Sequence, residues 1–146
     1  MASIEKRPID ELPNPSRKPK CESLFEEEWG KIYPGELVIT WYWFPTATSK
    51  RIDTKHIRGI YYRKQCISDD LGETKGWGMS FTPCWWACDI KRGRRKNSEK
   101  SGFYNVVIDI GEGNMKGFTT NNIRPFLKIL RSQCGRGVVC REGFPW

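Results

Sequence analysis

The sequence predicts a mainly β fold in which about seven strands precede one amphipathic helix. Short apolar or alternating segments, separated by Gly- and Pro-containing turns, fill the region from residue 24 to residue 118. A single segment after it repeats apolar residues with the helical period. The length of 146 residues fits one domain with its own core.

The predicted strands follow one another along the chain. They cover residues 24–33, 36–44, 50–53, 56–63, 77–81, 84–90, 102–110 and 115–118, with the last two paired as a hairpin. The second segment alternates with Leu37, Ile39, Trp41 and Trp43 on one side, yet its other side is also largely apolar. This strand is therefore either covered on both faces or carries an exposed aromatic row that forms a contact surface.

The helix is predicted after residue 122, with Asn122 as its amino-terminal cap and Gly135 at its end. Its apolar stripe has spacings of three, four and seven residues and consists of Ile123, Phe126, Leu127, Leu130 and Cys134. The expected organisation is thus a disordered or docking tail over residues 1–20, a domain over 21–135, and a C-terminal tail over 136–146. This last tail either folds back on the domain or binds a partner.

The order of strands and helix resembles that of pleckstrin-homology-like (PH-like) domains, in particular small bacterial-type members. Local similarity lies in Tyr42–Pro45 leading to Arg51–Asp53 and His56–Arg58, and in Gly117–Thr119 before the helix. The resemblance implies a strongly bent antiparallel sandwich or barrel of about seven strands, capped by one C-terminal α-helix. The basic first turn that holds phosphoinositides in many relatives is absent from residues 31–36, so that site does not carry over.

The densest positive charge follows an apolar segment. If residues 84–90 are extended, Cys84, Trp86, Cys88 and Ile90 share a core face and Trp85 lies on the outer surface. We expect the next residues to project as a mobile, solvated loop that contacts an anionic partner together with Trp85. The loop residues are Lys91, Arg92, Arg94, Arg95 and Lys96, and Arg63 and Lys64 form a secondary basic patch. The same charge run is also typical of a turn that only keeps a protein soluble.

Catalytic and metal-binding patterns are missing. His56 is the one histidine, and no nucleophile elbow, phosphate-binding glycine loop or zinc-hydrolase helix occurs. The six cysteines are spread along the chain, which favours reduced packing residues over disulfides or a zinc site. We therefore expect no enzyme activity, no cofactor and no metal.

The sequence favours a non-enzymatic binding or adaptor domain that recognises a protein, a peptide or an acidic surface. The net charge of +8 also permits two alternatives, a nucleic-acid-binding protein with basic-aromatic patches and a peripheral protein on anionic membranes. With no secretory signal and no apolar run of about 20 residues, a cytoplasmic, intracellular location is expected.

Overall fold

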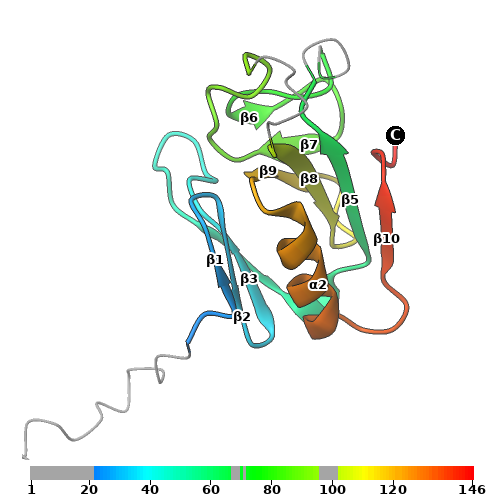
Figure 1. Ribbon diagram of the computed structural model, residues 1–146. Coiled ribbons are helices and arrows are strands. Elements are labelled where there is room, and N and C mark those ends of the chain that lie inside the picture. The colour runs from blue at the N-terminus through cyan, green and yellow to red at the C-terminus, as the bar shows by residue number, and fades with distance from the viewer. Residues whose placement is uncertain (1–21, 67–69, 71, 96–101) are drawn as a thin grey trace, which may run out of the picture.

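A computed structural model describes residues 22–66, 70, 72–95 and 102–146 of the chain, which form two β-sheets and the helix α2 (Figure 1). In the first sheet four antiparallel strands follow the order of the chain. They are β1 (Phe25–Glu26), β2 (Gly30–Tyr33), β3 (Glu36–Ile39) and β4 (Lys50–Asp53). Pro34 and Gly35 form the turn between β2 and β3, where the φ of 76° at Gly35 requires a residue without a side chain.

The second sheet is mixed and has the order β10-β5-β8-β9-β7-β6. Its strands are β5 (Gly59–Lys64), β6 (Gly78–Met79), β7 (Cys84–Trp86), β8 (Tyr104–Asp109), β9 (Met115–Thr120) and β10 (Val139–Glu142). Strands β5, β8 and β9 are antiparallel neighbours, whereas β7 pairs parallel to β9 and β10 parallel to β5. The prediction of a mainly β fold with one later helix is confirmed, and both sheets are open.

Helix α2 (Ile123–Gln133) lies between the first sheet and the β5 side of the second sheet (Figure 1). Its stripe places Phe126 and Leu130 in the core, and the Phe126 ring packs edge-on against Phe25 and Phe118 at 5.5 Å in both cases. Asn122 occupies the predicted cap position, but its side chain makes no cap bond and instead donates to Glu27 at 3.0 Å.

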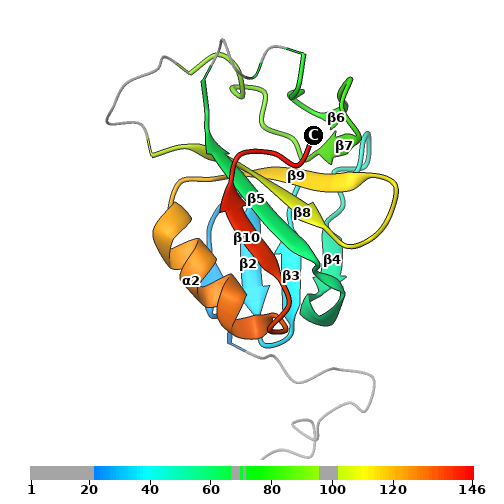
Figure 2. The same cartoon turned by 90° about the vertical axis from the view of Figure 1, so that its right-hand side faces the viewer.

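The C-terminal segment folds back on the domain. Strand β10 lies along β5, as Figure 2 shows, and the following Phe144 is buried on the outer face of the second sheet. There its ring lies 6.0 Å from Trp86 and 4.9 Å from Trp146. The second sheet is therefore covered on both faces near β7, which explains why Cys84 and Trp86 are fully buried.

Strands β3 and β7 end several residues earlier than the alternating pattern predicts. Strand β3 stops at Ile39, and Trp41 has the left-handed φ of 55°, so Trp41 and Trp43 are exposed on a loop instead of continuing the core row of Leu37 and Ile39. Strand β7 stops at Trp86, after which the chain turns.

The expected burial order after Trp86 is consequently wrong. Ala87 and Asp89 are buried, Cys88 is half-buried, and Ile90 is exposed. The physical reason is that a turn does not preserve the two-residue alternation of a strand.

Gly117 gives a direct test of the packing between β7 and β9. A Cβ atom added there would lie 2.4 Å from Cε3 of the buried Trp86 ring, whereas one added at Gly113 would meet nothing within 4 Å. We expect Gly117→Ala to lower the free energy of unfolding by about 1–3 kcal/mol and Gly113→Ala to change it by less than about 0.5 kcal/mol. Urea unfolding of both variants measures this difference, and equal stabilities would contradict the described packing.

Candidate binding pocket and its polar floor

An open pocket of about 660 Å³ lies where the loop after β3 meets the segment after β7. Aromatic side chains from three separate parts of the chain line it, namely Trp29, Trp41 and Phe103. The Trp29 and Phe103 rings contact edge to face at 6.2 Å. Trp41 is 52% exposed, which leaves much of its surface free for a ligand. Glu28 and Lys91 also line the pocket.

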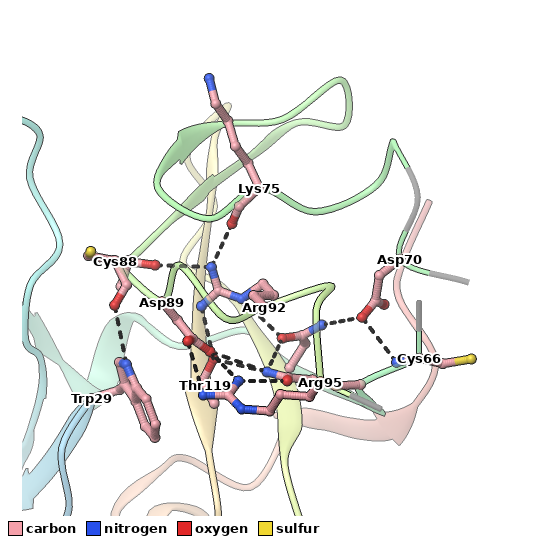
Figure 3. A network of polar contacts seen from close by, with 12 residues as sticks. Trp29, Cys66, Asp70, Lys75, Cys88, Asp89, Arg92, Arg95 and Thr119 are labelled. Carbon is pink, nitrogen blue, oxygen red and sulfur yellow. Dashed lines mark hydrogen bonds and ion pairs between the residues drawn. The ribbon is translucent and has the colours of Figure 1, made fainter. Parts of the chain in front are cut away.

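An ion pair closes the floor of the pocket. Arg95 donates to Asp89 through both terminal nitrogens, at 2.7 and 3.1 Å (Figure 3). The Arg95 guanidinium also lies 3.9 Å from the centre of the Phe103 ring and 5.6 Å from that of Trp29. Arg95 thus occupies the space next to the Trp29 and Phe103 rings. Because Asp89 balances its charge, this part of the pocket is nearly neutral.

Backbone contacts fix the loop that carries Trp41. The Trp41 carbonyl accepts from the Cys88 amide at 2.7 Å. Trp29 Nε1 donates to the Cys88 carbonyl at 3.2 Å (Figure 3). The carbonyl of the buried Tyr42 accepts from Nε1 of both Trp77 and Trp85, at 3.0 and 2.8 Å. These bonds hold the loop against the segment after β7, so the exposed Trp41 is presented on a fixed backbone.

Arg92 lies beneath the ion pair of Asp89 and Arg95 and is only 5% exposed. Each of its three guanidinium nitrogens has a hydrogen-bond acceptor (Figure 3). Its Nη1 donates to the carbonyls of Lys75 and Ala87 at 2.6 and 3.0 Å. Its Nε donates to Asn105 at 3.1 Å and its Nη2 to Thr119 at 3.0 Å, on β8 and β9. The guanidinium also lies 4.8 Å from the centre of the Trp86 ring.

The network continues through neutral side chains to a second ion pair. Gln65 Nε2 donates to Asn105 at 3.0 Å, and Asn105 Nδ2 donates to the buried Asp70 at 3.1 Å. Asp70 also pairs with Arg63 at 2.9 Å. The long connection between β5 and β8 is therefore fastened to the sheet by buried polar groups, which are stabilising only when each finds a partner.

The ionisation of the network follows from its burial and charges. Burial acts to raise the pKa of Asp89, but hydrogen bonds from Arg95 and Thr119 and the nearby charge of Arg92 outweigh it, and the pKa lies below its usual value. Burial lowers the pKa of Arg92 to about 10, against the opposing effect of Asp89. Both groups remain charged at neutral pH.

The structure corrects the expected basic loop. Arg92 is buried and Arg95 is largely buried in ion-pair contact, so the expectation that both project as mobile, solvated charges is wrong. Lys91 and Arg94 are exposed as expected, and Lys96 lies outside the described residues. The reason is that Asp89, Asn105 and Thr119 supply buried acceptors that the charge run alone does not reveal.

The other predicted residues also lie in different surroundings from those expected. Trp85 is half-buried against Tyr42 and Trp43, at ring distances of 6.3 and 5.9 Å. Arg63 is engaged with Asp70 and Glu73 and lies 4.1 Å from the centre of the Phe144 ring, while Lys64 is half-buried on β5. Contact of either basic patch with an anionic partner stays a prediction.

Sequence reasoning missed Trp29, Phe103 and Asp89 as parts of the pocket. No local sequence pattern around any of these residues marks it as part of a site, and only the tertiary fold brings the three together. The one available signal was the second predicted strand, apolar on both faces, for which an exposed aromatic row was one of two interpretations. In the structure the two interpretations apply to different parts of that segment: Leu37, Val38 and Ile39 are all buried, so β3 itself is covered on both faces, whereas Trp41 and Trp43 are exposed on the loop after it.

Within the described ranges, no three His, Cys, Asp or Glu side chains lie close enough together to hold a metal ion. His56 ends a short 3₁₀ turn (Thr54–His56) and is exposed. Cys84, Cys88, Cys134 and Cys140 are free thiols in this structure. No helix in the part of the chain that the structure describes is both long and apolar enough to cross a bilayer.

Comparison with protein-family models, with curated proteins and with solved structures found no match to this chain.

Arg92 and Arg94 form a matched pair for testing the polar floor. Arg92→Gln removes buried hydrogen bonds and a buried charge, and we expect it to lower the free energy of unfolding by about 3 kcal/mol. Arg94→Gln, at an exposed position two residues away, is expected to change it by less than about 0.5 kcal/mol. Chemical denaturation measures the free energy of unfolding of both variants. If the loop were solvated, the two variants would have equal free energies of unfolding.

The lowered pKa of Asp89 predicts a dependence of stability on acid. The unfolded carboxylate, with its ordinary pKa of about 3.9, binds a proton before the folded one does. The stabilisation is therefore complete above about pH 5 and is lost as pH falls through the lower folded pKa. Urea unfolding from about pH 5 to pH 2 should show a smaller acid-induced loss in Asp89→Asn than in the wild type. Equal losses would mean that Asp89 is not held ionised by this network.

Proposed function

We propose that this protein is a non-enzymatic binding module of PH-like architecture. It recognises a partner protein through the pocket lined by Trp29, Trp41 and Phe103, called here the Trp41 pocket. The order of elements supports the architecture: a four-stranded antiparallel sheet, the antiparallel strands β5, β8 and β9, and then helix α2. The connection between β5 and β8 supplies Asp89 and Arg95 to the pocket. Binding sites commonly lie on such connections, held by a rigid scaffold.

The exposed Trp41, fixed at the mouth of an aromatic pocket, is the observation that carries the proposal. Tryptophan is among the residues that contribute most binding energy at protein interfaces, above all beside a pocket that accepts a partner side chain. The cavity of about 660 Å³ is large enough for an aromatic or long aliphatic side chain. Trp43 and Phe44, exposed on the same loop, extend the apolar contact area.

The charges around the pocket favour a protein over a nucleic acid or an anionic membrane. Arg92 and Arg95 already bind acceptors inside the protein, so their guanidinium groups are not available for phosphates. Glu28 and Lys91 both line the pocket, and the presence of both charge signs suits the mixed polarity of a protein rim. A concave pocket with a built floor also suits one side chain better than a flat lipid surface.

A cytoplasmic location belongs to the same proposal. The free thiols of Cys84, Cys88, Cys134 and Cys140 suit a reducing compartment, where disulfides seldom persist.

A peptide selection tests the proposed function. The full chain is used to select ligands from a displayed library of random peptides, and the affinity of the selected peptides is measured by fluorescence anisotropy. We expect peptides with an aromatic or aliphatic anchor, and an increase in Kd of about 30-fold or more on Trp41→Ala. Trp146→Ala removes another partly exposed tryptophan, outside the pocket, and should leave the Kd within about 2-fold.

Two results would contradict the proposal. One is a set of selected peptides that bind Trp41→Ala as tightly as the wild type. The other is a single-stranded RNA or an anionic vesicle that binds through Trp41 while no peptide does.

A further inference from the structure

A second pocket, of about 440 Å³, opens where helix α2 ends and the chain turns toward β10. Figure 2 shows this turn at the end of α2, leading directly into β10. The pocket is lined by the last turn of the helix and by the residues that follow it, and it shares no lining residue with the Trp41 pocket.

The lining of this second pocket carries unopposed positive charge. Lys128 and Arg131 on the helix and Arg136 in the turn are exposed, and no Asp or Glu is among the lining residues. None of the three forms an ion pair with a residue that the structure describes, in contrast to Arg63, Arg95 and Lys116. Three like charges around one pocket repel one another, and a bound anion would relieve this repulsion.

Backbone donors are also available in the turn. The amides of Gly135, Arg136 and Gly137 donate to no other described residue, and the next amide, of Val138, returns to the Gly135 carbonyl at 3.4 Å. A Cβ atom placed at Gly135 or Gly137 would meet nothing within 4 Å, so the backbone there is open to approach. Successive free N–H groups form the concave donor sets that hold anions.

Nothing else in the pocket cancels this charge. Burial, together with the neighbouring Cys140, raises the pKa of the Cys134 thiol to about 11, so Cys134 is neutral at physiological pH. The carboxyl end of a helix carries only about half a negative charge, which three formal positive charges exceed.

From these contacts we infer that the pocket lined by Lys128, Arg131 and Arg136 binds a phosphate group, either free or as the monoester of a small molecule. Arginine guanidinium groups present paired donors that match phosphate oxygens, and lysine adds a point charge. The pocket is larger than one phosphate requires, which leaves room for a small organic group attached to it.

A purely structural role for these cations makes a different prediction. Basic residues in the last turn of a helix stabilise it without any ligand, which accounts for Lys128 and Arg131. Arg136 and the free amides lie beyond the end of the helix, where this effect fades, and a structural role predicts no saturable response to phosphate.

The test uses the ¹⁵N-labelled full chain and NMR titration with inorganic phosphate and with phosphoserine, at constant ionic strength kept by sodium chloride. We expect saturable shifts of the Gly135, Arg136 and Gly137 amides. The double variant Arg131→Gln/Arg136→Gln should raise the Kd at least about 10-fold. Arg124→Gln, which removes an exposed arginine of the same helix outside the pocket, should change it by less than about 2-fold.

The single variant Arg136→Gln lies outside the helix and keeps the test decisive if the double variant does not fold. Tighter binding of phosphoserine than of phosphate identifies the monoester as the ligand class, and the reverse order identifies free phosphate. Shifts that rise linearly, or that are equal in Arg124→Gln and Arg136→Gln, would overturn the inference. So would binding that occurs only to vesicles of phosphatidylcholine and phosphatidylserine.

Discussion

The buried guanidinium of Arg92 is the constraint on which the arrangement of the segments around β7, β8 and β9 depends. A charge in a protein interior is tolerated only when its donors are satisfied, and Arg92 draws partners from the connection after β5, from the end of β7 and from β8 and β9. Because these segments must meet at one point, residues 75–92 of the connection between β5 and β8 are held in a defined shape.

That shape in turn produces the pocket. With Arg92 fixed below, Asp89 and Arg95 pair at the pocket floor, and the Cys88 amide and carbonyl bind Trp41 and Trp29 on either side. The aromatic walls and the polar floor are therefore one assembly. The exposed Trp41 is supported by the network without being part of it, as preorganised recognition requires.

The sequence predicts the class of fold because its patterns are local. Alternation in β2 to β5, the β8–β9 hairpin and the stripe of Phe126 and Leu130 are readable within single segments. The site is not readable in this way. Arg92 and Arg94 look alike in the sequence, and only the acceptors Asn105 and Thr119, which are distant along the chain, decide that one is buried and the other exposed. The end of β3 before Trp41 likewise depends on tertiary contacts with Cys88.

Hydrogen exchange at two backbone amides tests most directly whether the segment after β7, which carries Cys88, Asp89 and Arg92, is a rigid floor of the pocket. The Cys88 amide donates to the Trp41 carbonyl at 2.7 Å and the Asp89 amide to the Gly76 carbonyl at 2.8 Å. If the Arg92 network holds the segment, both amides exchange only on global unfolding, with protection on the order of 10³-fold or more. Exchange of both amides at the rate of an unstructured peptide would show a mobile loop and contradict the account.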